Sequence, residues 1–68
     1  MKVISGKRMC AIVERHGWSL ARIAGSHHIY VKSGINIRLT IPVHSNSDLK
    51  RGLQRAIMKA AGIEDKDL

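Results

Sequence analysis

Two adjacent histidines follow a glycine and a serine in the stretch Gly25-Ser26-His27-His28. Histidine is the side chain whose ordinary pKa of about 6.5 lets it accept or release a proton near neutral pH. RNA carries its own nucleophile, the 2′-hydroxyl, so an imidazole base helped by Lys or Arg can cleave it without a metal. A histidine at a strand start is more often a capping or packing residue, so His27 alone does not decide between the two roles.

The residues that a metal site would need are scarce. Only two acids, Glu14 and Asp48, precede the last five residues, which excludes a carboxylate-rich two-metal nuclease. His27 and His28 are neighbours, and neighbours in a strand point to opposite faces, which argues against both binding one metal. The single cysteine, Cys10, leaves no internal disulfide and no Cys/His cluster for zinc. We therefore expect no metal and no cofactor.

The charge balance indicates a polyanionic partner. The chain has 12 Lys and Arg against 5 Asp and Glu, and three of the acids, Glu64, Asp65 and Asp67, lie in the last five residues. Nucleic acid is the commonest polyanion in a cytosol, and a body this cationic attracts it. An anionic membrane surface is the rival interpretation, and a merely solubilising charge is the third. No strongly amphipathic basic helix and no apolar run of signal or membrane-span length is present, so we expect a cytoplasmic protein with no membrane partner.

Hydrophobic periodicity predicts the first element that positions these residues. A helix is expected from Gly6 to His16, with Ser5 as its N-cap and Gly17 as its left-handed stop. Its buried face is expected to consist of Met9, Ile12, Val13 and His16, with Cys10 beside it.

Three strands should follow. They are predicted at residues 18–24, 28–32 and 35–41, with a turn or bulge at Gly25-Ser26 and a hairpin at Ser33-Gly34. Pro42 ends the third strand. Trp18, Leu20 and Arg22 are expected on one side of the first strand, and Tyr30 and Trp18 are expected to pack. The third strand should present one apolar face made of Ile35, Ile37, Leu39 and Ile41.

A second helix is predicted to run to Ala61, with Asp48 or Ser47 as its cap and Gly62 as its stop; the alternative is that Gly52 marks its true start. Its buried stripe is expected to be Leu49, Leu53, Ile57 and Ala60 or Ala61. Residues 1–63 should form a single domain, and residues 64–68 should be a frayed acidic tail. The predicted class is α+β in the order α-β-β-β-α, a three-stranded antiparallel sheet with both helices on one face. This order and layering are those of a double-stranded-RNA-binding domain, although fold alone does not give function.

Basic residues fall in two sets that suit a phosphate backbone. Arg22, Lys32 and Arg38 are expected on the open face of the sheet, and the second helix carries Lys50, Arg51, Arg55 and Lys59 away from its leucines. A solvated surface role stays open for each of them. His44 follows Pro42 at the exit of the third strand. A solvated loop histidine is the favoured interpretation, and the alternative is that its place at a strand end returns it to the other histidines.

Several short motifs in a fixed order give the chain a family resemblance. They are Gly17-Trp18, Gly25-Ser26-His27-His28 with Tyr30, Leu39-Thr40-Ile41-Pro42 with His44, Asp48-Leu49-Lys50 with Gly52, and Arg55, Ile57, Lys59 and Ala61-Gly62-Ile63. With them, the chain resembles the HicA-like (YcfA-like) mRNA interferase toxins of type II toxin–antitoxin systems.

The resemblance implies a fold and a function. It implies the double-stranded-RNA-binding-domain fold, RNA cleavage without a metal, and a HicB-like antitoxin that masks the site. The family's catalytic histidine directly follows Gly-Ser, which makes His27 the expected general base on the 2′-hydroxyl of mRNA. We further expect RNA contacts from Ser26, His28, Lys32, Arg38, Lys50 and Arg55.

The chain departs from the family pattern at two places. Many relatives have His-Pro where this chain has Lys32-Ser33, and they often have Gly-Thr-Leu-Arg where it has Gly52-Leu53-Gln54-Arg55. Lys32 replaces a second histidine with a fixed positive charge. A non-catalytic RNA-binding module with the same fold is therefore the alternative function.

Overall fold

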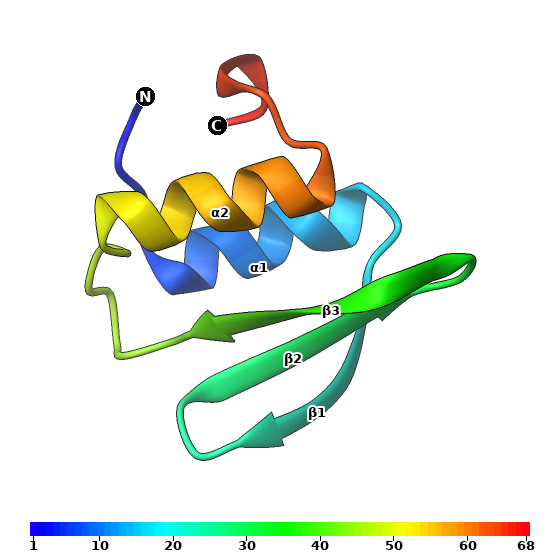
Figure 1. Cartoon of the computed structure of the whole chain (residues 1–68). Coiled ribbons are helices and arrows are strands. Elements are labelled where there is room, and N and C mark those ends of the chain that lie inside the picture. Colours follow the sequence, from blue (N-terminus) through cyan, green and yellow to red (C-terminus); the bar gives the residue numbers. More distant parts are fainter.

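The computed structural model describes all 68 residues. The elements are α1 (Gly6–Arg15), β1 (Ser19–Ala24), β2 (His27–Lys32), β3 (Ile35–Pro42), α2 (Arg51–Ala61) and a final 3₁₀ turn, η1 (Asp65–Asp67). The strands form one antiparallel sheet in the order β1-β2-β3. Both helices lie side by side on one face of the sheet, run in the same direction, and leave the other face open (Figure 1). The predicted α+β class and α-β-β-β-α order are confirmed, and no helix is long and apolar enough to span a membrane.

Local sequence explains both ends of α1. Ser5 is the N-cap, and its hydroxyl accepts the backbone N–H of Arg8 at 3.0 Å. After the last helical residue, Arg15, His16 is the C-cap and Gly17 takes a φ of 93°. The predicted cap and stop are confirmed.

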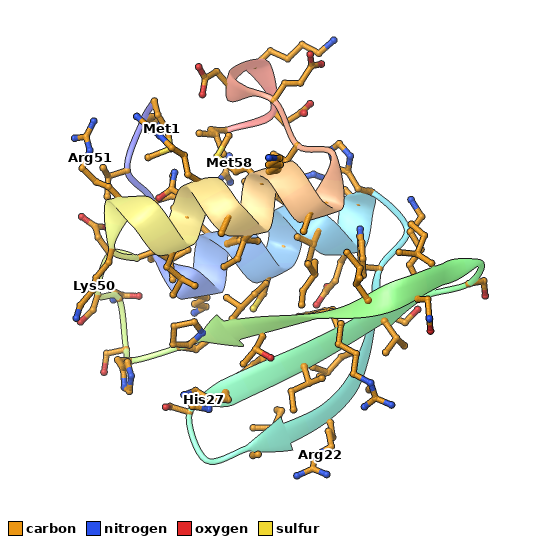
Figure 2. All side chains as sticks on the ribbon, viewed as in Figure 1. Met1, Arg22, His27, Lys50, Arg51 and Met58 are labelled. Atoms are coloured by element: carbon orange, nitrogen blue, oxygen red, sulfur yellow. The ribbon has the colours of Figure 1, made fainter.

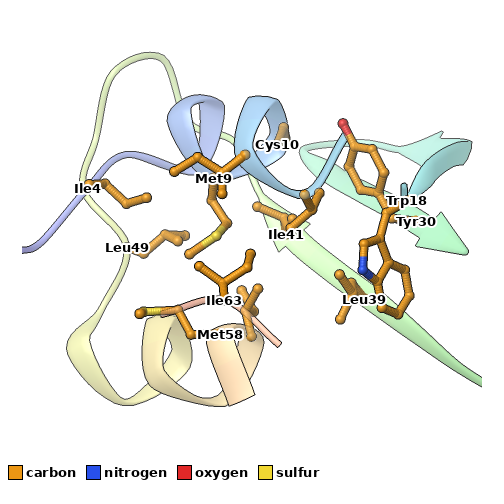
Figure 3. Close-up of a cluster of buried hydrophobic side chains, with 13 residues drawn as sticks. Ile4, Met9, Cys10, Trp18, Tyr30, Leu39, Ile41, Leu49, Met58 and Ile63 are labelled. Carbon is orange, nitrogen blue, oxygen red and sulfur yellow. The ribbon is translucent and has the colours of Figure 1, made fainter. Parts of the chain in front are cut away.

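The core lies between the helices and the sheet. Tyr30 and Trp18 pack inside it, as predicted, at 1% and 3% exposure. The buried apolar side chains, most of them labelled in Figure 3, are Ile4, Met9, Cys10, Ile12, Val13, Trp18, Tyr30, Leu39, Ile41, Leu49, Ile57, Met58 and Ile63.

The predicted cap of the second helix at Ser47 or Asp48 is wrong, and the alternative start at Gly52 lies one residue after the observed start at Arg51. Asp48 pairs with Ser5 in an isolated antiparallel bridge, and the N–H of Leu49 donates to the Ile4 carbonyl at 2.8 Å. The chain is therefore extended until Lys50, the N-cap of α2. Because Leu49 is not helical, its four-residue spacing from Leu53 does not place the two side chains on one helical stripe.

The residue of α2 that enters the core at this level is Gln54, which is fully buried, whereas Leu53 is 38% exposed. The Gln54 amide accepts the N–H of Ile4 at 3.0 Å and donates to the Lys2 carbonyl at 2.7 Å. A buried amide with both of its polar atoms paired is tolerated in a core. Gln54 thereby ties the N-terminal segment to α2.

The expected apolar face of β3 is only half buried. Leu39 and Ile41 lie in the core, but Ile35 is 41% and Ile37 is 46% exposed. The β2–β3 hairpin extends beyond the helices, so nothing covers its outer end (Figure 1).

β1 contains an irregularity that the alternation did not predict. Leu20 pairs with Tyr30 while Arg22 pairs with Ile29, so a bulge separates them. The expectation that Leu20 and Arg22 share a side is wrong, because the extra residue turns Arg22 to the open face.

The C-terminal residues are ordered by local bonds, contrary to the expected frayed tail. Glu64 and Asp67 form a reciprocal capping box around η1. The guanidinium of Arg8 donates to the Leu68 carbonyl at 3.3 Å, and Leu68 packs against the core.

Candidate active site

A two-residue turn presents the histidine pair. Gly25 takes a φ of 60°, which favours glycine and matches its position in type II′ hairpin turns. The turn closes between Ala24 and His27, which are paired across β1 and β2. His27 is thus the first residue of β2 and stands at the end of the sheet.

The imidazole of His27 is exposed and unbonded. His27 is paired with Ala24 on one side and Pro42 on the other, and neither neighbour carries a polar side chain. It makes no hydrogen bond or ion pair within the chain. Both ring nitrogens are therefore available to a bound molecule.

Strand alternation separates His27 from His28. Tyr30 and His28 are paired with Leu39 and Ile41, which lie in the core, so they occupy the helix-covered side of β2. His28 is accordingly half-buried, whereas His27 is exposed and belongs to the open side.

The structure brings a third histidine to this end of the sheet. The N–H of Val43 donates to the Ser26 carbonyl at 2.7 Å, and the Ser26 hydroxyl lies 3.5 Å from Nε2 of His44. The sequence suggested a solvated loop residue, and His44 is indeed exposed. Its contact is nevertheless with Ser26, the residue that directly precedes His27 in the chain. The only sequence signal for this was its position at a strand exit.

The hydroxyl of Tyr30 fixes β2 under α1. It donates to the Glu14 carboxylate at 2.5 Å, a charge-assisted bond. Burial, reinforced by the bond to Glu14, raises the pKa of Tyr30 far above its ordinary value of 10.0. Burial also raises the pKa of the neighbouring Cys10 thiol, which fits the predicted role of a small buried hydrophobe. Glu14 is therefore bound to Tyr30 and is not a partner for His27.

The predicted cationic residues do not all converge on His27. The ammonium of Lys32 donates to the His16 carbonyl at 2.8 Å, so it stabilises the C-terminal end of α1. Its predicted place on the open face is wrong, because Lys32 shares the helix-covered side with Tyr30. Arg38 is exposed on the open face, as Arg22 is.

Lys50, the N-cap of α2, lies at the end of the sheet that carries His27. It lies with His44 in the lining of a pocket of about 280 Å³ between the end of β3 and the start of α2. Figure 2 shows His27 at the same end of the molecule as Lys50 and Arg51. Arg55 lies two residues beyond the pocket-lining Leu53, and residues two apart do not share a helix face. Arg55 is therefore on a different flank of α2 from the pocket.

No three of the His, Cys, Asp and Glu side chains come together as a group that could hold a metal ion.

Comparison with protein families places this geometry in context. A family model described as the HicA toxin of bacterial toxin–antitoxin systems matches residues 6–63, which span α1, the whole sheet and α2. The chain belongs to the HicA toxin family. The match confirms the resemblance carried by the sequence motifs. A HicA toxin is one half of a toxin–antitoxin pair, so an antitoxin partner is implied. No curated protein matches the chain.

Proposed function

We propose that this HicA-family chain is a metal-independent endoribonuclease that cleaves mRNA, with His27 as the general base. The observation that carries the proposal is the imidazole of His27, exposed and unbonded at the end of the sheet between two apolar neighbours. A general base must reach its substrate's proton without competition from an internal partner, and His27 meets this condition.

The reaction follows from the chemistry of RNA. His27 removes the proton of a 2′-hydroxyl, the 2′-oxygen forms a bond to the adjacent phosphorus, and the bond from phosphorus to the 5′-oxygen breaks. The leaving 5′-oxygen takes a proton, and His44 in its imidazolium form is the proposed donor because it lies beside Ser26. The products are a 2′,3′-cyclic phosphate and a 5′-hydroxyl.

Positive charge near the phosphate stabilises the transition state. Lys50 is the proposed contributor, because it lines the same pocket as His44. Arg38 precedes Leu39, which is paired with Tyr30, so it lies four residues along β3 from Pro42 and is proposed to contact RNA farther along the open face. Ser26 is proposed to contact the same phosphate. Arg55 is proposed to contact RNA farther from the cleaved bond, because it lies on another flank of α2.

The proposed antitoxin is a HicB-like protein that covers the exposed end around His27. The body of the toxin is cationic, since only Glu14 and Asp48 among its first 63 residues are acidic. An acidic antitoxin surface would bind this cationic body and would thereby keep RNA away from His27. The proposed place of this interaction is the cytosol, where mRNA is found.

The test of this function uses the substrate's own nucleophile. One short RNA with a mapped cleavage site and a copy with 2′-deoxyribose at the cleaved nucleotide are incubated with the toxin in a chelator. The proposal predicts cleavage of the first to a 2′,3′-cyclic phosphate and none of the second. Loss of cleavage in the chelator, or equal cleavage of the deoxy copy, would overturn it.

One observation favours a non-catalytic RNA-binding module as the second candidate. Lys32 stands where many relatives have histidine, and its ammonium is bound to the His16 carbonyl. That position therefore supplies no imidazole. This alternative predicts salt-sensitive RNA binding with intact RNA after long incubation.

A further inference from the structure

The pocket near His27 is lined by an acidic and an apolar residue as well as by a cation, and the proposed cleavage reaction does not use the first two. Its lining residues come from the end of β3, the following loop and the start of α2: Pro42, His44, Ser47, Asp48, Leu49, Lys50 and Leu53. Pro42 is also the sheet neighbour of His27. The pocket is thus one strand away from the proposed general base. Its volume of about 280 Å³ is small for a ligand pocket and suits a single ring system.

One wall of the pocket is apolar and open. Leu53 is 38% exposed although it is a large hydrophobic residue on a helix. Pro42, at the end of β3, and His44 also line the pocket. Proteins that read single-stranded RNA splay bases out and stack them on aromatic rings, and His44 is the one aromatic residue of the lining.

The pocket also contains the one acid of the body without an internal partner. Glu14 binds Tyr30, whereas the carboxylate of Asp48 makes no hydrogen bond or ion pair. A carboxylate on an RNA-binding surface repels phosphates and therefore weakens binding unless it accepts hydrogen bonds from a base.

We propose that this pocket binds the nucleobase next to the cleaved phosphate and prefers guanine; the inference rests on the proposed function. Guanine presents two adjacent donors, N1–H and the 2-amino group, to a carboxylate that can only accept. Adenine, cytosine and uracil each place an acceptor beside their donor on that edge, and Asp48 would repel it. Lys50 lies at the same pocket and neutralises the phosphate of the bound nucleotide.

The experiment measures binding, so that it does not depend on catalysis. Short oligouridines with 2′-fluoro sugars, which lack the nucleophilic hydroxyl, carry one central guanine, inosine, adenine or cytosine. The wild-type chain should bind the guanine probe about tenfold or more tightly than the adenine and cytosine probes. Inosine lacks the 2-amino group, so its affinity should fall between these two levels.

Two variants and one control locate the preference. Asp48→Asn keeps the size of the side chain but adds a donor, so the guanine preference should disappear. Leu53→Ser removes the exposed apolar side chain from the pocket lining and should weaken binding of the guanine probe. Asp65→Asn alters an exposed acid of η1, away from the pocket, and should bind like the wild type. Circular dichroism confirms that each variant is folded.

The result separates this proposal from the proposed function. Equal binding of all four probes by the wild type, or a guanine preference that survives in Asp48→Asn, overturns the base pocket even if natural RNA is cleaved. A preference that depends on Asp48, with no cleavage of natural RNA, supports the pocket and overturns the catalytic proposal instead.

Discussion

At the residue scale, the alternation of β2 places side chains with different roles on the two faces of the sheet. His27 faces the open side and is free of internal bonds, whereas Tyr30 faces the helices and is bound to Glu14. The first is placed for chemistry, and the second holds the strand that carries it. Substitution of His27 should therefore change the cleavage rate, whereas substitution of Tyr30 should change the free energy of unfolding.

Tyr30→Phe tests the structural half of this division. The substitution removes the hydroxyl bond to Glu14, and hydrogen bonds to charged groups contribute about 1.5–3 kcal/mol. Because Glu14 is exposed and can return to water, we expect a loss of about 1–2 kcal/mol in the free energy of unfolding. Urea denaturation measures it, and an unchanged midpoint would show that the bond contributes nothing.

The raised pKa of Tyr30 also predicts alkaline sensitivity. Below pH 10 the phenol is protonated in both states, so it has no effect on stability. Above that pH the unfolded chain releases the proton and the folded chain retains it, so stability falls as pH rises. The fall can reach about 1.4 kcal/mol per pH unit for one proton. Tyr30→Phe should lose stability less steeply between pH 10 and 11, and parallel curves would contradict this assignment.

The burial of Gln54 could not be predicted from the sequence. Its burial depends on pairing with Lys2 and Ile4, some fifty residues away, and no local pattern reports such a contact. Because Gln54 is the residue of α2 that enters the core at this level, its neighbour Leu53 is left exposed. The exposed Leu53 is part of the pocket lining.

At the element scale, α1, β3 and α2 meet next to the site. The first residue of α1, Gly6, lies against the last residue of β3, Pro42, and a Cβ at Gly6 would overlap the Pro42 carbonyl. Pro42 in turn is paired with His27. The type and order of the helices and strands followed from periodicity. The late start of α2 did not, because it results from the bridge between Ser5 and Asp48.

A pair of glycine substitutions tests this junction. Gly6→Ala forces α1 and β3 apart, and overpacking of this kind costs about 1–3 kcal/mol. Gly52→Ala is the matched control, because its new Cβ meets nothing within 4 Å. It lies inside α2 and should stabilise the fold by up to about 1 kcal/mol. Urea denaturation of both variants should move in opposite directions; equal shifts would remove the argument that Gly6 is required by packing.

At the scale of the whole molecule, charge is the feature that the sequence predicted most directly. The chain has a formal net charge of +7. Its sheet has one open face (Figure 1). Which cations lie together could not be predicted from the sequence. Lys32 binds the His16 carbonyl at the end of α1, and Arg55 lies on a different flank of α2 from the pocket.

RNA binding should therefore depend on salt through particular lysines. For single strands the slope of log K against log salt is about −0.7 for each phosphate contact. Lys50→Ala should weaken binding and reduce the magnitude of the slope by about 0.7. Lys66→Ala removes a cation that is paired with Glu64 at 3.3 Å in the tail, and its slope should match the wild type. Identical slopes for all three proteins would exclude Lys50 from the phosphate contacts.

The central claim is that His27 transfers the proton that starts RNA cleavage. The most direct test is the single-turnover cleavage rate of one defined RNA by the wild type, His27→Ala and His28→Ala, each checked for folding and RNA affinity. The account predicts a fall of about 10²- to 10⁴-fold for His27→Ala with unchanged affinity, and a much smaller effect for His28→Ala. A folded His27→Ala protein that cleaves at the wild-type rate would contradict it.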